Sequence, residues 1–171
     1  NPVGEFWGDP SWACWHMGGA WLSTHLWEHY QFTLDKEFLA ERGYPLLKGA
    51  AEFCLDWLVE DKHGNLITSP ATSPENYFRT PDGYAGPTAY GTTCDLAIIR
   101  ECLSATASAA EVLGIDEELQ NRIADVMKRL YPYQIGHKGN LQEWYYDWED
   151  PEPLHRHQSH LIGLFPGSHI T

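Results

Sequence analysis

A glutamate in a proline-rich stretch is the first residue of this sequence whose setting could support chemistry. Glu75 lies in Ser73-Pro74-Glu75-Asn76, within a segment 69–91 that has four prolines, and so long a loop in a compact domain is usually functional or mobile. Aromatic neighbours, here Tyr77 and Phe78, would desolvate the carboxyl and keep it protonated for donation. Taken alone, the pattern is more typical of a solvated loop glutamate than of a catalytic one.

A second acidic stretch offers a partner for such a donor. Glycoside hydrolysis needs two carboxyl groups, one to protonate the departing oxygen and one to activate water or to attack. Asp147 stands between Tyr146 and Trp148, which fits a pocket wall, whereas Asp150 precedes Pro151 and could simply start a turn or cap a helix. The other acids of this stretch, Glu143, Glu149 and Glu152, are expected to be mostly ordinary surface groups.

Two histidine-containing stretches complete the candidate set. In the stretch 155–160, His-Arg-His-Gln-Ser-His, Arg156 and His157 could donate hydrogen bonds to sugar hydroxyls or orient a carboxylate. The other stretch, 25–29, reads His-Leu-Trp-Glu-His, which matches the inverted zinc-protease pattern. A zinc peptidase using His25, Glu28 and His29 is therefore the rival hypothesis, but so short a pattern also arises by chance. We expect no metal and no cofactor.

Composition restricts the partners. The chain has 171 residues, 43% of them hydrophobic, and a net charge of −13, so it can form one domain with a core of its own, and nucleic acid is not expected to bind. No apolar run reaches the ~18–20 residues that span a bilayer, so we expect no membrane partner. Eight Trp and nine Tyr residues supply flat faces on which sugars could stack, although core aromatics are also common.

The elements that must position these residues are mainly helices. Apolar spacing predicts helices over about 17–30, 36–43, 45–61, 93–113, 117–130 and 154–166, with short β-hairpins near 63–68 and 138–144. Their ends are expected at caps formed by Asp35 and Asp116, at Pro45 as a first helical residue and at Gly114 as a stop. The tripeptide Gly64-Asn65-Leu66 recurs at 139–141, each time between a helix and an acidic loop. Repeated helix pairs of this kind describe an all-α toroid, which would bring Glu75 and the acids at 147–150 to one rim.

Several motifs in order resemble glycoside hydrolase family 95. They are Gly18-Gly19-Ala20-Trp21, His25-Leu26-Trp27-Glu28-His29-Tyr30, Ser73-Pro74-Glu75-Asn76, the stretch 95–101, Leu141-Gln142-Glu143-Trp144 and the stretch 155–161. The resemblance implies an (α/α)6 barrel and an inverting hydrolase that releases α-L-fucose, chiefly α-1,2-linked, from oligosaccharides or glycans. An α-L-galactosidase of the same family is the alternative.

The resemblance also implies the roles of individual residues. Glu75 would be the general acid and Asp147, which fits the pattern Glu-Trp-x-x-Asp, the carboxylate on the base side, with Asp150 as the fallback. Substrate contacts are expected from six residues: Trp15, Trp21, His25, Glu28, Arg156 and His157.

The sequence departs from the family at two places. The family's two water-activating Asn residues have no counterpart before Gly18, and His16 stands where the family has proline. We therefore expect residues 1–171 to be a partial (α/α)6 catalytic domain, truncated at both ends, whose partners are a fucosylated glycan and the remainder of its own domain. Such a fragment is expected to be poorly stable or inactive alone. The compartment is not encoded here, and we expect a parent enzyme that is secreted or periplasmic.

Overall fold

The computed structural model describes residue 11 and residues 14–170, which divide into two compact units. The helical unit comprises residues 17–66 and 98–130, and the loop unit comprises residue 11 and residues 14–16, 67–97 and 131–170. Helix α5 (Thr93–Leu113) begins in the loop unit and continues into the helical unit. The elements are mainly helical with short β-hairpins, as the predicted all-α class requires. No described helix is long and apolar enough to cross a membrane.

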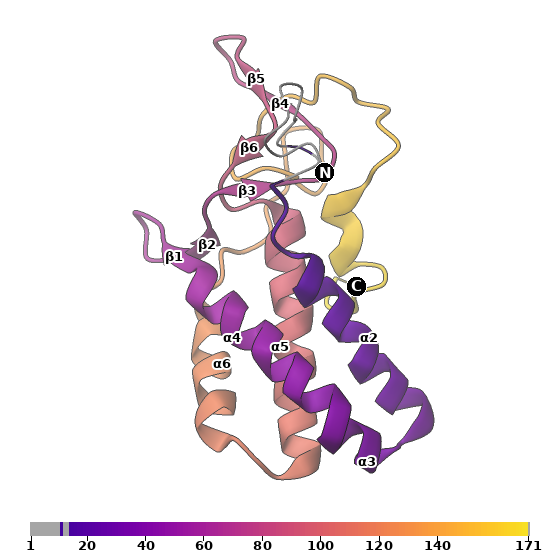
Figure 1. Cartoon of the computed structure of the whole chain (residues 1–171). Coiled ribbons are helices and arrows are strands. Elements are labelled where there is room, and N and C mark those ends of the chain that lie inside the picture. The colour runs from indigo at the N-terminus through magenta and orange to yellow at the C-terminus, as the bar shows by residue number, and fades with distance from the viewer. Residues whose placement is uncertain (1–10, 12–13, 171) are drawn as a thin grey trace. The chain divides into compact units, whose positions relative to one another are not determined.

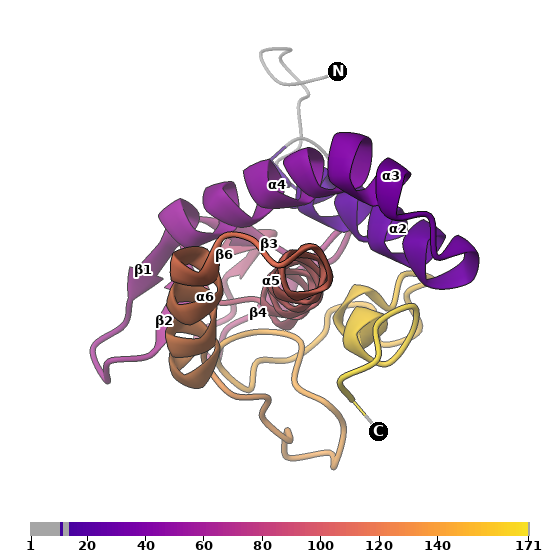
Figure 2. The same ribbon diagram turned by 90° about the horizontal axis from the view of Figure 1, so that it is seen from below.

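The helical unit is built around α5. Its other elements are α2 (Gly18–Thr33), α3 (Lys36–Phe38), the π-helix η1 (Leu39–Gly43), α4 (Tyr44–Trp57) and α6 (Glu117–Arg129). Helix α2 packs against α4 (Figure 1). Figure 2 looks along α5 and shows α2, α3 and α4 as an arc on one side of it, with α6 beside the end of α4.

Small residues of α5 form one side of the core of the helical unit. Ala105, Ala109 and Ala110 are buried in one cluster with four larger side chains, Tyr30, Leu39, Tyr44 and Leu47. Alanines permit a close approach of the neighbouring helices, and the apolar area removed from water stabilises the packing by roughly 25 cal/mol per Å². The Thr106 hydroxyl donates to the Leu47 carbonyl oxygen at 3.2 Å, which adds a polar link between α5 and α4.

Helix ends follow the predicted signals in most places. The Asp35 carboxylate accepts a hydrogen bond from the Phe38 amide at 2.9 Å, which confirms the predicted cap. Pro45 lies in the first turn of α4, and Gly114, at φ +68°, follows the last residue of α5, where a left-handed conformation suits glycine.

The predicted capping role of Asp116 is wrong. Its side chain makes no capping hydrogen bond to α6, because it accepts hydrogen bonds from the Tyr44 hydroxyl and the Lys48 ammonium, both at 2.7 Å. Burial and the bond to Asp116 raise the pKa of Tyr44. Asp116 therefore ties the start of α6 to α4.

Short strands are interspersed in the loop unit. Strand β3 (Ala71–Thr72) pairs antiparallel with β6 (Thr88–Ala89), and β4 (Phe78–Arg79) pairs antiparallel with β5 (Ala85–Gly86). The segment 69–91 is thus a loop stiffened by two small ladders. Before it, β1 (Leu58–Glu60) and β2 (Leu66–Thr68) pair as the predicted first hairpin.

Two predicted elements of the loop unit are shorter than expected. The second hairpin is reduced to an isolated bridge between Ile135 and Leu141. The last helix is reduced to the 3-10 turn η2 (Ser159–Gly163). Residues 154–158 form turns and irregular backbone instead of a helix, and Arg156 and Ser159 bond to Glu75 and Pro74, which are distant in the sequence.

Candidate active site

Glu75 lies at the centre of a tight turn in the loop unit. The Asn76 amide donates to the Ser73 carbonyl oxygen at 2.7 Å, so that Pro74 and Glu75 occupy the two central positions. Proline suits the first of these because its φ is already fixed near the required value. We call residues 73–76 the Glu75 turn. Ser73 is fully buried, while the Glu75 side chain is 35% exposed, so the turn presents its carboxylate at an accessible position.

The histidine-containing stretch meets this carboxylate. Oε2 of Glu75 is 3.1 Å from an Nη atom of Arg156 and 3.4 Å from Nε2 of His157. The sequence allowed these two residues either to orient a carboxylate or to bind sugar hydroxyls. The structure shows the first arrangement, and the sugar contacts stay a prediction.

Glu75 opens onto a cavity of about 570 Å³, which we call the Glu75 pocket. That volume falls in the range of small-molecule sites. Its walls carry acids, amides and histidines: Glu75, Asn76, Tyr77, Lys138, Asn140, Glu143, Asp150, Pro151, Glu152, Pro153, His155, Arg156, His157, Gln158 and His160. The pocket therefore brings together the two acidic loops that the sequence nominated, with Asp150 on the same walls as Glu75.

Asp147 lies in a neighbouring position. It lines a smaller hollow of about 30 Å³ that shares Asn140, Glu143, Asp150 and His160 with the Glu75 pocket. Its Oδ2 accepts hydrogen bonds from the backbone N–H of His137 at 2.7 Å and pairs with that residue's Nδ1 at 3.0 Å. The backbone bond from His137 lowers the pKa of Asp147. An ionised carboxylate of this kind can accept a proton but is a poor donor.

The expected aromatic surroundings of Glu75 are arranged differently. Phe78 is 3% exposed, and its ring stacks on Trp148 at 4.3 Å and meets the edge of Trp144 at 5.1 Å between centroids. Phe78 thus packs in the core of the loop unit. The polar partners of the Glu75 carboxylate are Arg156 and His157.

Glu143 is the functional candidate that the sequence did not single out. It is only 8% exposed, and its Oε1 accepts hydrogen bonds from Ser73 Oγ at 2.6 Å and Asn76 Nδ2 at 2.8 Å. Thr93, at the start of α5, holds the same stretch, because its amide donates to the Glu143 carbonyl oxygen at 3.0 Å and its hydroxyl to the Gln142 carbonyl oxygen at 2.5 Å. The signal was present: Glu143 stands directly before Trp144, an aromatic residue typical of a core.

Trp15 contacts another buried carboxyl. Asp95 is 3% exposed; it accepts a hydrogen bond from the Thr68 hydroxyl at 3.1 Å, and the Trp15 side chain lies near it. Burial raises the pKa of Asp95 to about 7, although the side chains of Thr68, Trp15 and Thr92 oppose that shift. The sugar contact predicted for Trp15 stays a prediction.

The remaining predicted contacts, Trp21, His25 and Glu28, belong to α2 of the helical unit, whereas Glu75 belongs to the loop unit. Nδ1 of His25 lies 3.2 Å from the Leu22 carbonyl oxygen, and the His29 ring packs on Phe38 at 4.3 Å. Among residue 11 and residues 14–170, no three His, Cys, Asp or Glu side chains gather as a metal-binding group. The contacts of α2 thus fit helix packing and lend no support to the zinc-peptidase alternative.

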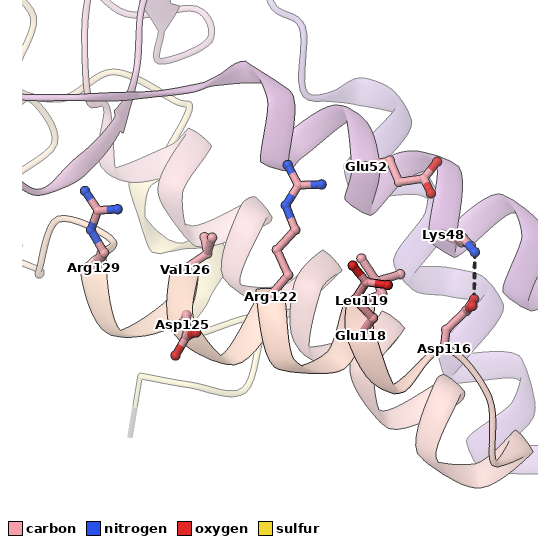
Figure 3. A pocket seen from close by; sticks show the side chains of 9 residues that line it. All are labelled: Lys48, Glu52, Asp116, Glu118, Leu119, Arg122, Asp125, Val126 and Arg129. Atoms are coloured by element: carbon pink, nitrogen blue, oxygen red, sulfur yellow. Dashed lines mark hydrogen bonds and ion pairs between the residues drawn. The ribbon is translucent and has the colours of Figure 1, made fainter.

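A second hollow, of about 560 Å³, lies between α4 and α6 of the helical unit (Figure 3). We call it the charged groove. It is lined by Lys48, Glu52, Asp116, Glu118, Leu119, Arg122, Asp125, Val126 and Arg129. Its cations are already paired: Lys48 with Asp116 at 2.7 Å, Arg122 with Asp56 at 3.3 Å, and Arg129 with Glu60 at 2.5 Å. The Glu75 pocket is therefore the better candidate for an active site.

Comparison with known proteins identifies the family of the chain. Residues 2–171 match the family described as the glycosyl hydrolase family 95 catalytic domain. The chain belongs to this family, as its motifs predicted.

Named relatives agree with that membership. The chain is 50% identical over 165 residues to "Alpha-L-fucosidase 2" of Arabidopsis thaliana, an alignment that covers 96% of this chain and 20% of the relative. It is 35% identical over 169 residues to "Probable alpha-fucosidase A" of Aspergillus niger, covering 94% of this chain and 20% of the relative. The chain thus spans about a fifth of the length of these relatives.

Proposed function

We propose that this chain is part of the catalytic domain of an inverting glycosidase that releases α-L-fucose, with α-1,2-linked fucose as the main substrate. The observation that carries the proposal is the Glu75 pocket, in which the family's predicted acid lies with Arg156 and His157 on its carboxylate and with Asp150 on the same walls. The two relatives named as fucosidases support the choice of sugar.

In this proposal Glu75 protonates the departing glycosidic oxygen. Its partly exposed position lets it reach a bound sugar, and Arg156 and His157 hold the oxygen Oε2 in place. Inversion needs a second carboxylate, on the opposite side of the scissile bond, that activates water.

The base-side carboxylate is proposed to be Asp147, with Asp150 as the alternative. The bond from the His137 backbone lowers the pKa of Asp147, which keeps this carboxylate ionised, and Asp150 has the place in the Glu75 pocket. Since the chain spans a fifth of its relatives, we propose that the water-activating asparagines and the remaining helices of the barrel come from the rest of a parent enzyme.

The test uses the parent enzyme on 2′-fucosyllactose, with NMR detection of the first anomer released. The expected product is β-L-fucose, the inverted anomer. Retention of configuration, or faster release of L-galactose than of fucose from matched aryl glycosides, would contradict the proposal.

The same assay assigns the base-side carboxylate. Asp147→Asn is expected to lower kcat by about 10²-fold or more, and Asp150→Asn by much less, because only the base-side group takes up the proton of water. The opposite order would assign the role to Asp150. Two variants with wild-type kcat would show that neither residue acts on the base side.

A further inference from the structure

Glu143 is a buried carboxylate that the proposed reaction does not use. Both of its close hydrogen bonds fall on one oxygen: Oε1 accepts from Ser73 Oγ at 2.6 Å and from Asn76 Nδ2 at 2.8 Å. Ser73 and Asn76 are the first and last residues of the Glu75 turn. Glu143 therefore holds both ends of the turn that has Glu75 near its centre.

The second oxygen of Glu143 faces the segment that follows Arg156 and His157. Oε2 lies 3.4 Å from Nδ1 of His160, whose side chain is 14% exposed. The preceding residue, Ser159, donates its hydroxyl to the carbonyl oxygen of Pro74. Glu143 is thus in contact with the two segments that determine where the Glu75 carboxylate lies. One is the Glu75 turn, and the other is the stretch 155–160, whose Arg156 and His157 contact that carboxylate.

The stretch around Glu143 is itself anchored. The Thr93 amide and hydroxyl, at the start of α5, bond to the carbonyl oxygens of Glu143 and Gln142. The side-chain Nε2 of Gln142 in turn donates to the carbonyl oxygens of Trp144 at 2.8 Å and Tyr145 at 3.0 Å. Because the backbone at Glu143 is held in place, its side chain can hold Ser73 and Asn76 in fixed positions.

We propose that Glu143 is a positioning residue for Glu75, acting through Ser73 and Asn76 to fix the direction in which the Glu75 carboxyl faces the departing oxygen. This inference rests on the proposed role of Glu75 as the general acid. Proton transfer requires the donor within hydrogen-bond reach of the oxygen, and a displacement of about 1 Å can cost about 10²-fold in rate.

The experiment compares two leaving groups in the parent enzyme. Glu143→Met preserves the bulk of the side chain and removes both acceptor oxygens. On 2′-fucosyllactose, whose leaving group needs protonation, we expect kcat to fall about 10²-fold with little change in KM. On 2-chloro-4-nitrophenyl α-L-fucoside, whose acidic phenol leaves without a proton, we expect a fall of less than about tenfold.

Two further variants separate positioning from simple loss of structure. Glu143→Gln retains one carbonyl oxygen that can accept both bonds, and it is expected to stay within about threefold of wild type on both substrates. Ile67→Ala is the matched structural control, because Ile67 is buried in β2 and forms none of these side-chain hydrogen bonds. It is expected to affect both substrates equally.

Equal losses on the two substrates in Glu143→Met would overturn the inference, as would a Gln variant that is as impaired as the Met variant. If Glu143→Met does not fold, Ser73→Ala removes one of the two bonds and must show the same dependence on the leaving group. The role of Glu75 is tested apart from this one: if Glu75→Gln retains full turnover of 2′-fucosyllactose, the proposed function fails whatever Glu143 does.

Discussion

Two hollows of nearly equal volume, about 570 and 560 Å³, differ in what their charged groups do. In the charged groove, each of Lys48, Arg122 and Arg129 pairs with an acid of a neighbouring segment. In the Glu75 pocket, Arg156 and His157 converge on one carboxylate that is partly exposed. The comparison indicates that volume alone does not nominate a candidate site, whereas side-chain donors that converge on an accessible acid do.

The largest expected difference between the hollows is in turnover. Glu75→Gln in the parent enzyme should lower kcat on 2′-fucosyllactose by about 10²–10⁴-fold, the range that general acid catalysis contributes. Its melting temperature should change little, because the side chain is partly exposed. Initial-rate kinetics and a thermal melt on the same sample measure both. A kcat within about threefold of wild type, far from the loss expected of a general acid, would remove the distinction between the hollows.

Asp95, a buried acid of the loop unit, is expected to make the free energy of unfolding depend on pH in a way that the acids of the charged groove do not. Burial raises the pKa of Asp95 to about 7, so the folded protein retains a proton that the unfolded chain loses near pH 4. The free energy of unfolding contributed by Asp95 is thus fully present below about pH 4 and is lost as pH rises towards 7, by on the order of 1 kcal/mol per pH unit.

The measurement is urea unfolding of the parent enzyme and its Asp95→Asn variant between pH 4 and 8. The difference in unfolding free energy, wild type minus variant, should decrease from pH 4 to 7 and then level off. A difference that stays constant with pH would show that Asp95 is ionised in the folded protein. The groove acids serve as a control: Asp116 has its pKa lowered, chiefly by the hydrogen bond from Lys48, so Asp116→Asn should show no such decrease across this range.

The smallest effect is expected in the charged groove. Arg122 pairs with Asp56 at 3.3 Å, and both side chains are more than half exposed. Figure 3 shows Arg122 extending from α6 towards α4. Arg122→Met should change the free energy of unfolding by less than about 1 kcal/mol, as for other exposed pairs, and should leave kcat unchanged. A loss of activity comparable to that of Glu75→Gln would mean that the groove, and not only the pocket, serves the reaction.

Helices were easier to predict from this sequence than the segments that form the site. The cap at Asp35, the start near Pro45 and the end at Gly114 follow local rules, and all three are confirmed. Asp116 and the last helix follow the same rules and were predicted wrongly. In the first case a tertiary bond to Lys48 competes with the cap, and in the second Arg156 and Ser159 bond to the distant Glu75 turn.

The site was predicted in part, for a physical reason. Motifs identified Glu75 and the stretch with Arg156 and His157, and the structure places these together. Glu143 was classed with the surface acids because a short-range pattern does not reveal that Ser73 and Asn76, about 70 residues earlier in the chain, bond to its carboxylate. Such long-range contacts depend on the packing of the loops, which local spacing does not encode.

The bonds from Thr93 to the carbonyl oxygens of Gln142 and Glu143 have a consequence for how homologous proteins can vary. They fix the chain at the start of α5, and the Glu143 side chain fixes it again at the Glu75 turn. Residues 131–133, which precede His137 and its bond to Asp147, therefore do not set the position of Glu75. Insertions and deletions should accumulate there during evolution without loss of function. Between Glu143 and Arg156, by contrast, each change in length alters the distance between the two groups that hold the Glu75 turn and its carboxylate. Length variation across the family should therefore be unequal on the two sides of Glu143.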